Sequence, residues 1–117
     1  MADAGGGQEY LTLRGAQAEV DATIRALGGY WPPLANLARL FEECGELARA
    51  LNQAHGPKLR KPDEAAASAS DELGDALYVL LVLANSLDLD AETALSNALA
   101  KVAARVPTES ASTDEPS

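Results

Sequence analysis

A run of nine consecutive apolar residues, Ala76 to Ala84, constrains the fold of this chain more than any other feature. The run is too short to span a bilayer, which needs ~20 residues. As a helix it would be apolar on every side, so we expect it to form a buried central helix. Aromatic residues make up only 4% of the chain. Alanine and leucine must therefore supply most of the packing, which favours an all-α fold.

Helical spacing and helix-breaking residues predict three further helices. Apolar residues recur at three- and four-residue steps before Gly28 and Gly29, and again between Pro33 and the loop at Gly56. Asp90 is the expected N-cap of the last helix. Short links between four helices predict a helical bundle. The predicted helices are residues 8–27, 33–54, 64–87 and 90–106. The predicted apolar face of the second helix consists of Leu34, Leu37, Phe41, Cys44, Ala48 and Leu51.

The chain length of 117 residues fits a single domain, which we place at residues 8–106. The Gly-rich residues 1–7 and the polar, acidic residues 107–117 are expected to be disordered. The single cysteine, Cys44, excludes an internal disulfide and agrees with a reducing compartment. No charged-then-apolar leader opens the chain, so we expect no signal peptide and a cytoplasmic protein.

The formal net charge of −9 argues against nucleic acid as a partner, since sequence-independent binding needs a basic surface. We likewise expect no membrane partner. An acidic protein still binds phosphates when a metal ion supplies positive charge. Lys58, Arg60 and Lys61 form one basic cluster, in the loop after the second helix.

Glu72 and Asp75 occupy one face of the third predicted helix, at the start of the stripe that must be buried. Burying an unpaired carboxylate is strongly unfavourable. No Lys or Arg occurs between Lys61 and Lys101. The neutralising charge must therefore come from another segment, another chain or a metal ion.

Glu43 and Glu46 form a second acidic pair with the same spacing. Taken alone, this pair is also typical of a solvated surface, where Arg39 would form an ion pair with Glu43. Packed against the third helix, the two pairs would face each other. Oxygen ligands alone favour Mg²⁺ or Mn²⁺. One cysteine and the lone His55 make a zinc site a poor alternative.

The segment Glu43-Cys44-Gly45-Glu46 followed by Glu72-Leu73-Gly74-Asp75 resembles the signature of the MazG family of all-α nucleoside triphosphate pyrophosphohydrolases. Residues 17–106 are similar to the short, single-domain YpjD-like group of that family. The resemblance implies cleavage of a nucleoside triphosphate to monophosphate and pyrophosphate, as house-cleaning of the nucleotide pool. It also implies a homodimer or a dimer of dimers. The metal ligands it implies, for Mg²⁺ with Mn²⁺ as a substitute, are Glu43, Glu46, Glu72 and Asp75.

The same resemblance assigns catalytic roles to Glu42, Glu43 and Glu46. A carboxylate near a metal-bound water accepts its proton, and Glu42 would support the ligands or orient that water. Candidates for substrate binding are Lys58, Arg60 and Lys61 for the outer phosphates, Trp31 with Tyr30 for stacking on a base, and Asn85 for the sugar or base. Each candidate also has a purely structural interpretation. The basic residues would lie in a solvated loop, the two aromatic residues would belong to a connector next to prolines, and Asn85 would end its helix.

Two other interpretations remain open from the sequence. One is a narrow dUTP- or dCTP-type pyrophosphatase, because nothing in the sequence determines the preferred base. The other is a noncatalytic helical dimer that binds a nucleotide or a metal.

Overall fold

The computed structural model describes residues 10–57, 61–63 and 66–107. Its four helices are α1 (Leu13–Ala26), α2 (Pro33–His55), α3 (Ala69–Ser86) and α4 (Ala91–Arg105). The described residues contain no strand, which confirms the prediction of an all-α fold. None of the described helices is both long enough and apolar enough to cross a membrane.

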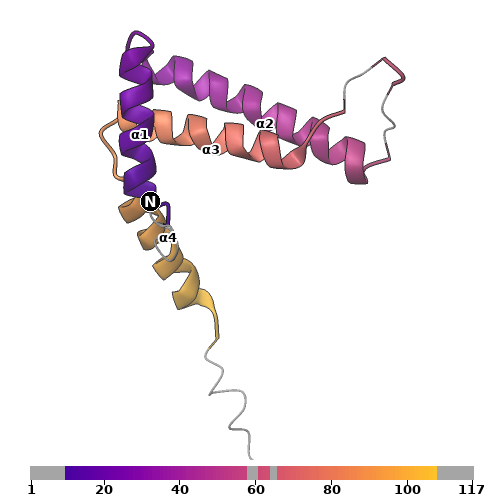
Figure 1. The fold of residues 1–117 in the computed structure, drawn as a ribbon. Helices are drawn as coiled ribbons and strands as arrows, with labels where there is room; N and C mark the ends of the chain where they lie inside the picture. Colours follow the sequence, from indigo (N-terminus) through magenta and orange to yellow (C-terminus); the bar gives the residue numbers. More distant parts are fainter. Residues whose placement is uncertain (1–9, 58–60, 64–65, 108–117) are drawn as a thin grey trace, which may run out of the picture.

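Helices α2 and α3 form an antiparallel hairpin, and α1 crosses the end of that hairpin where α2 begins and α3 ends (Figure 1). Helix α4 contacts α1 and extends away from the hairpin (Figure 1). No residue of α4 is buried. The core of one chain is therefore built by α1, α2 and α3.

The core lies where α1 crosses α3. Val20 and Ile24 of α1 pack with Val82 of α3, and Tyr30 and Tyr78 lie against this cluster. Ala76, Val79 and Val82 of the predicted run are buried, but the prediction of a helix buried on every side is wrong within one chain. The opposite side of α3 is not covered within one chain. Its leucines at positions 73, 77 and 80 are about half exposed.

The predicted apolar face of α2 is wrong as a description of its packing within one chain. Leu34 is 79% exposed and Phe41 is 67% exposed. The buried positions of α2 are Asn36 and Ala50, with Leu47 half-buried between them. Helix α2 carries apolar residues on two faces, and the face that packs internally is the one that also carries Asn36.

Both ends of α1 follow from local chemistry. Thr12 is the N-cap, and its Oγ1 accepts a hydrogen bond from the amide of Gly15 at 3.0 Å. Residues 10–12 are therefore not helical, and the predicted start at residue 8 is too early. At the other end, Gly28 and Gly29 have φ values of 116° and 105°, which side chains disfavour. These glycines terminate the helix as predicted, and Pro33 opens α2 in the first turn.

Helix α3 begins at Ala69, five residues after the predicted start. Ser68 is its N-cap, with Oγ accepting from the amide of Asp71 at 3.1 Å. The amide of Ala67 donates instead to Gln53 Oε1 on α2, at 2.9 Å. The alanines at 66 and 67 favour helix, but the cap and this tertiary hydrogen bond place the boundary later. Asp90 caps α4 as predicted, accepting from the amide of Glu92 at 3.3 Å.

Candidate metal and nucleotide site

The antiparallel pairing of α2 and α3 brings acids of both helices together. One carboxylate oxygen from each of Glu43, Glu72 and Asp75 lies within 4.8 Å of the other two. Glu43 and Glu72 are half-buried, and Asp75 is exposed. Three of the four acids expected from the sequence to bind a metal therefore converge on one point.

The electrostatics of this cluster favour a bound cation. Burial raises the pKa of Glu72, and the negative charges of Asp75, Glu46 and Glu43 raise it further, while Arg49 opposes the shift. Like charges held this close repel one another, and a divalent cation relieves that repulsion. Carboxylate oxygens suit a hard ion such as Mg²⁺. The residues present thus fit a divalent-cation site.

Glu46 lies next to this cluster but points toward another partner. Its Oε1 is 3.2 Å from Nε of Arg49, three residues later on the same helix. Glu42 is exposed on the same helix. Arg49, the cation beside the acids, was not predicted from the sequence. The spacing of Glu46 and Arg49 on one helical face was the available signal.

Arg39 does not form the surface ion pair with Glu43 that was one interpretation of the sequence. Its guanidinium lies 5.9 Å from the ring centroid of Trp31 and 5.8 Å from that of Tyr78. Among the described residues, no ion pair joins Arg39 to a carboxylate. Glu43 instead lies beside Glu72 and Asp75, whereas Glu46 forms an exposed ion pair with Arg49.

Asn85 lies at the far end of α3 from the acids. Ten residues separate it from Asp75, which is ~15 Å along a helix. Its Oδ1 accepts from Gln17 Nε2 at 2.8 Å, and its Nδ2 donates to the Gln17 carbonyl at 3.0 Å. These bonds join α3 to α1, and a role for Asn85 in substrate binding stays a prediction.

An open groove of about 660 Å³ runs along the junction of α1 with the end of α3. Trp31 and Asn85 line it, together with Arg14 and Arg25. None of the clustered acids does. Of the basic residues predicted to bind phosphates, Lys61 is exposed, whereas Lys58 and Arg60 lie outside the described residues.

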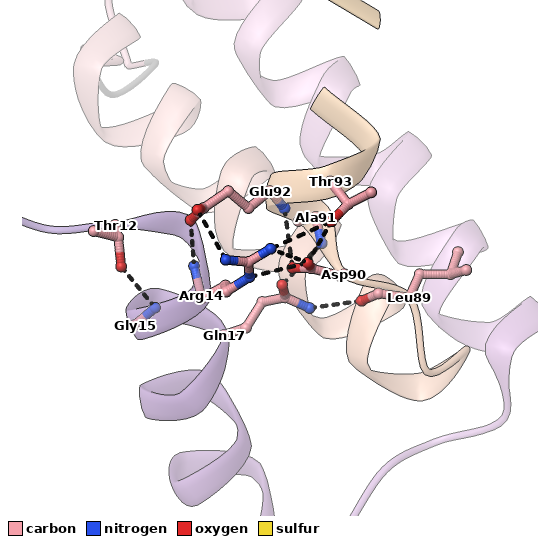
Figure 2. Close-up of polar contacts among 9 residues, drawn as sticks. All are labelled: Thr12, Arg14, Gly15, Gln17, Leu89, Asp90, Ala91, Glu92 and Thr93. Atoms are coloured by element: carbon pink, nitrogen blue, oxygen red, sulfur yellow. Dashed lines mark hydrogen bonds and ion pairs between the residues drawn. The ribbon is translucent and has the colours of Figure 1, made fainter. Parts of the chain in front are cut away.

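Polar contacts fasten the first turn of α4 to α1 beside this groove (Figure 2). Arg14 donates from Nε and Nη2 to Asp90 Oδ2, at 3.0 and 2.8 Å, and its Nη1 lies 3.3 Å from Glu92 Oε2. The hydrogen bond from Arg14 is the main cause that lowers the pKa of Asp90 to about 2. Gln17 Oε1 accepts from the amide of Ala91 at 2.9 Å. These contacts are polar, partly exposed and independent of the acid cluster.

The fold and the site together define a class: an all-α protein whose helical hairpin carries a cluster of carboxylates suited to a divalent cation. Residues 32–109 match the family model of the MazG nucleotide pyrophosphohydrolase domain. The chain belongs to this family, and is a hydrolase that acts on nucleotide phosphoanhydrides. The matched region contains both acidic pairs.

Individual relatives agree with this assignment. The chain is 50% identical over 84 residues to the uncharacterized protein YpjD of Bacillus subtilis strain 168, covering 71% of this chain and 76% of the relative. The crystal structure of YpjD from Bacillus subtilis superposes with a TM-score of 0.72 and 45% identity, covering 80% of this chain and 97% of that one. The Bacillus-conserved MazG protein, a nucleotide pyrophosphohydrolase, gives a TM-score of 0.71 and 40% identity, covering 87% and 98%.

Proposed function

We propose that this protein is a metal-dependent nucleoside triphosphate pyrophosphohydrolase that converts a (d)NTP and water to (d)NMP and pyrophosphate. The observation that carries the proposal is the convergence of Glu43, Glu72 and Asp75 within 4.8 Å, in a chain of the MazG family. The physiological role that fits is house-cleaning of the nucleotide pool, in the cytoplasm. The net charge of −9 supports a nucleotide rather than a nucleic acid as substrate.

Glu43, Glu72 and Asp75 would hold Mg²⁺, or Mn²⁺ in its place, and Glu46 would join them by turning away from Arg49. When bound, the cation screens the triphosphate from the acidic protein and stabilises charge on the phosphoryl oxygens. Glu42 and Glu46 are the proposed proton acceptors. One of them would take the proton of the attacking water, whose oxygen bonds to phosphorus as the α–β anhydride breaks.

The substrate-binding roles remain those suggested by the sequence. Lys58, Arg60 and Lys61 would hold the outer phosphates, and their loop follows the end of α2. Trp31 is available for stacking because its side chain lines a cavity and is more than half exposed. Asn85 would contact the sugar or base only after exchanging its bonds with Gln17.

We further propose that the enzyme acts as a homodimer or a dimer of dimers. The exposed apolar residues of α2, such as Phe41, and those of α3, such as Leu77, form two stripes. At ~100° per residue, both stripes project from one side of the antiparallel hairpin, whereas Glu46 and Asp75 project from the other side. A second copy can therefore cover the apolar side without blocking the acids, which supports self-association.

The activity is tested by incubating the protein with Mg²⁺ and each common NTP and dNTP, with products resolved by ion-exchange chromatography. Monophosphate plus pyrophosphate is the expected product pair. Activity confined to dUTP or dCTP would instead indicate a narrow pyrophosphatase. Absence of turnover with both Mg²⁺ and Mn²⁺ would indicate a noncatalytic binding protein.

Variants of the acids test the site itself. We expect Glu46→Gln and Asp75→Asn to lower kcat by at least ~10²-fold, because each removes a proposed ligand charge. Glu19→Gln, at an exposed position of α1, is the matched control and should retain activity. Circular dichroism checks that each variant is folded. Full activity in the folded Glu46 and Asp75 variants would overturn the site assignment.

A further inference from the structure

A small cavity lies between α1, α2 and α3, separate from the acid cluster. Its volume is about 190 Å³. Ile24 and Val82 contribute apolar wall, and Trp31 and Tyr78 contribute aromatic wall. Pockets of this kind, apolar with a few fixed polar groups, are typical of small-molecule sites.

The most deeply buried polar side chain of this cavity is that of Asn36, which is only 2% exposed. Its Nδ2 donates to the carbonyl oxygen of Trp31 at 3.2 Å, and this bond fixes the orientation of the amide. No described residue donates a hydrogen bond to Asn36 Oδ1. A buried acceptor without a donor is unfavourable, so a ligand that brings an N–H into the cavity would be stabilised there.

The aromatic walls suit a flat ligand. The guanidinium of Arg39 lies within 6 Å of the ring centroids of both Trp31 and Tyr78, so these three side chains form one cluster at the cavity. Planar heterocycles stack on tryptophan, tyrosine and guanidinium planes alike. The cavity thus offers stacking surfaces together with a buried, oriented hydrogen-bond acceptor.

The cavity begins one helical turn from the acids. Tyr78 follows Asp75 by three residues, and Arg39 precedes Glu43 by four, which correspond to ~4.5 and ~6 Å along the helix axes. At ~100° per residue, Arg39 and Tyr78 project from the same side of the hairpin as Glu46 and Asp75. A ligand with a flat ring in the cavity can therefore extend toward the acid cluster.

We propose that this cavity receives the nucleobase of the substrate, and that Asn36 Oδ1 accepts a hydrogen bond from an N–H on the edge of that base. The inference rests on the proposed function and adds the place where the base is recognised. The larger groove beside α1 is a poorer candidate, because Gln17 and Asn85 already satisfy each other there, as do Arg14 and Asp90.

The single tryptophan of the chain makes the proposal directly measurable, because Trp31 lines the cavity. The four dNMPs are titrated in Mg²⁺ while tryptophan fluorescence is followed, with deoxyribose 5-phosphate as the ligand that lacks a base. We expect the dNMPs to change the fluorescence and deoxyribose 5-phosphate to leave it unchanged. An equal response to both ligands would overturn the proposal.

The hydrogen bond is tested first on the ligand, with the wild-type protein. The dNMP that binds most tightly is compared with the derivative in which every N–H of its base is replaced by N–methyl. We expect the derivative to bind at least tenfold more weakly. Equal binding would show that Asn36 Oδ1 does not receive the base.

Asn36→Leu then removes the acceptor at nearly constant side-chain volume. We expect KM to rise at least tenfold and kcat to change less than threefold, because Asn36 touches the base and not the reacting phosphates. Asn52→Leu, at an exposed position of the same helix, is the matched control. An unchanged KM in folded Asn36→Leu would overturn the proposal.

Failure of this inference is distinguishable from failure of the proposed function. Turnover of dNTPs without a Trp31 response, and without sensitivity to N-methylation, would leave the function standing and reject the cavity as the base site. Base-dependent fluorescence without any turnover would keep the cavity as a base site and reject the enzyme.

Discussion

At the scale of single residues, the sequence predicted which acids lie close together better than it predicted their neighbours. Glu43, Glu72 and Asp75 converge because two Glu-x-x-acid pairs lie on helices that pack together. The side chains around them were not predictable in the same way. Asn36 is buried and Arg39 packs on aromatic rings because of how α2 rotates against α3, and this rotation depends on all three core helices.

The repulsion among the acids predicts that divalent cations stabilise the protein. Mg²⁺ at ten times its dissociation constant should stabilise the native state by ~1.4 kcal/mol and raise Tm by several degrees. Differential scanning fluorimetry with Mg²⁺ against EDTA measures this shift. Asp75→Asn should lose most of the response while melting no lower than wild type in EDTA, because it removes a charge that raises the pKa of Glu72. An unchanged Tm in Mg²⁺ and in Mn²⁺ would contradict a preformed site.

The ion pair of Asp90 predicts a defined loss of stability in acid. Its folded pKa of about 2 lies below the ordinary aspartate pKa of 3.8, so the unfolded chain binds more protons between these values. The stabilisation that ionised Asp90 gives the native state is complete above the unfolded pKa, and it is lost as the pH falls through about 2. Asp90→Asn keeps a good N-cap and removes only the charge.

Thermal melts from pH 6 to pH 2 check this prediction. The difference in Tm between wild type and Asp90→Asn should begin to shrink near pH 4 and be mostly lost at pH 2, where the folded carboxylate is half protonated. Asp88→Asn is the control, since Asp88 is exposed and asparagine tolerates its φ of 56°. A difference that stays constant with pH would show that the charge of Asp90 does not stabilise the fold.

At the scale of helices, the pattern of apolar residues correctly predicted the four helices seen in the described part of the chain, and local capping decided their boundaries. The end of α1 at the two glycines was readable because positive φ is a property of the residue itself. The start of α3 was not readable, because the competing signals were a run of alanines, a serine cap and a hydrogen bond from Ala67 to a distant glutamine. The last of these exists only in the folded chain.

The cap of α3 gives a test at this scale. Ser68→Ala should lower stability by ~1 kcal/mol, because the amide of Asp71 loses its acceptor. Chemical denaturation measures the effect. Ser70→Ala lies inside the first turn, at an exposed position, and should change stability by less than ~0.5 kcal/mol. Equal effects of the two substitutions would show that Ser68 does not cap the helix.

At the scale of the whole molecule, one chain leaves a large part of its apolar residues outside its core. Exposed leucines occur on α2, α3 and α4, including Leu95 and Leu99 on α4, and α2 also exposes Phe41. The apolar face predicted for α2 therefore exists in the sequence, but its side chains are exposed in a single chain. A sequence pattern shows which side chains avoid water, and it does not show whether their cover comes from the same chain.

The oligomeric state tests this reading. Light scattering should give a mass of at least two chains for wild type, and Phe41→Glu or Leu77→Glu should shift the mass toward one chain, since each places a charge in the proposed contact. Leu11→Glu, exposed and outside both stripes, is the control and should keep the wild-type mass. A monomeric wild type would remove the proposed assembly.

The attachment of α4 has a kinetic consequence. A helix without buried residues, held through Arg14 and Asp90, opens locally at little cost, so its amide hydrogens should exchange with solvent much faster than those of α3. Salt screens the ion pairs and should accelerate that exchange further. If α4 instead packs on a second chain, its exchange slows as protein concentration rises. The rate of deuterium uptake by residues 91–105 would then measure whether the chains have assembled.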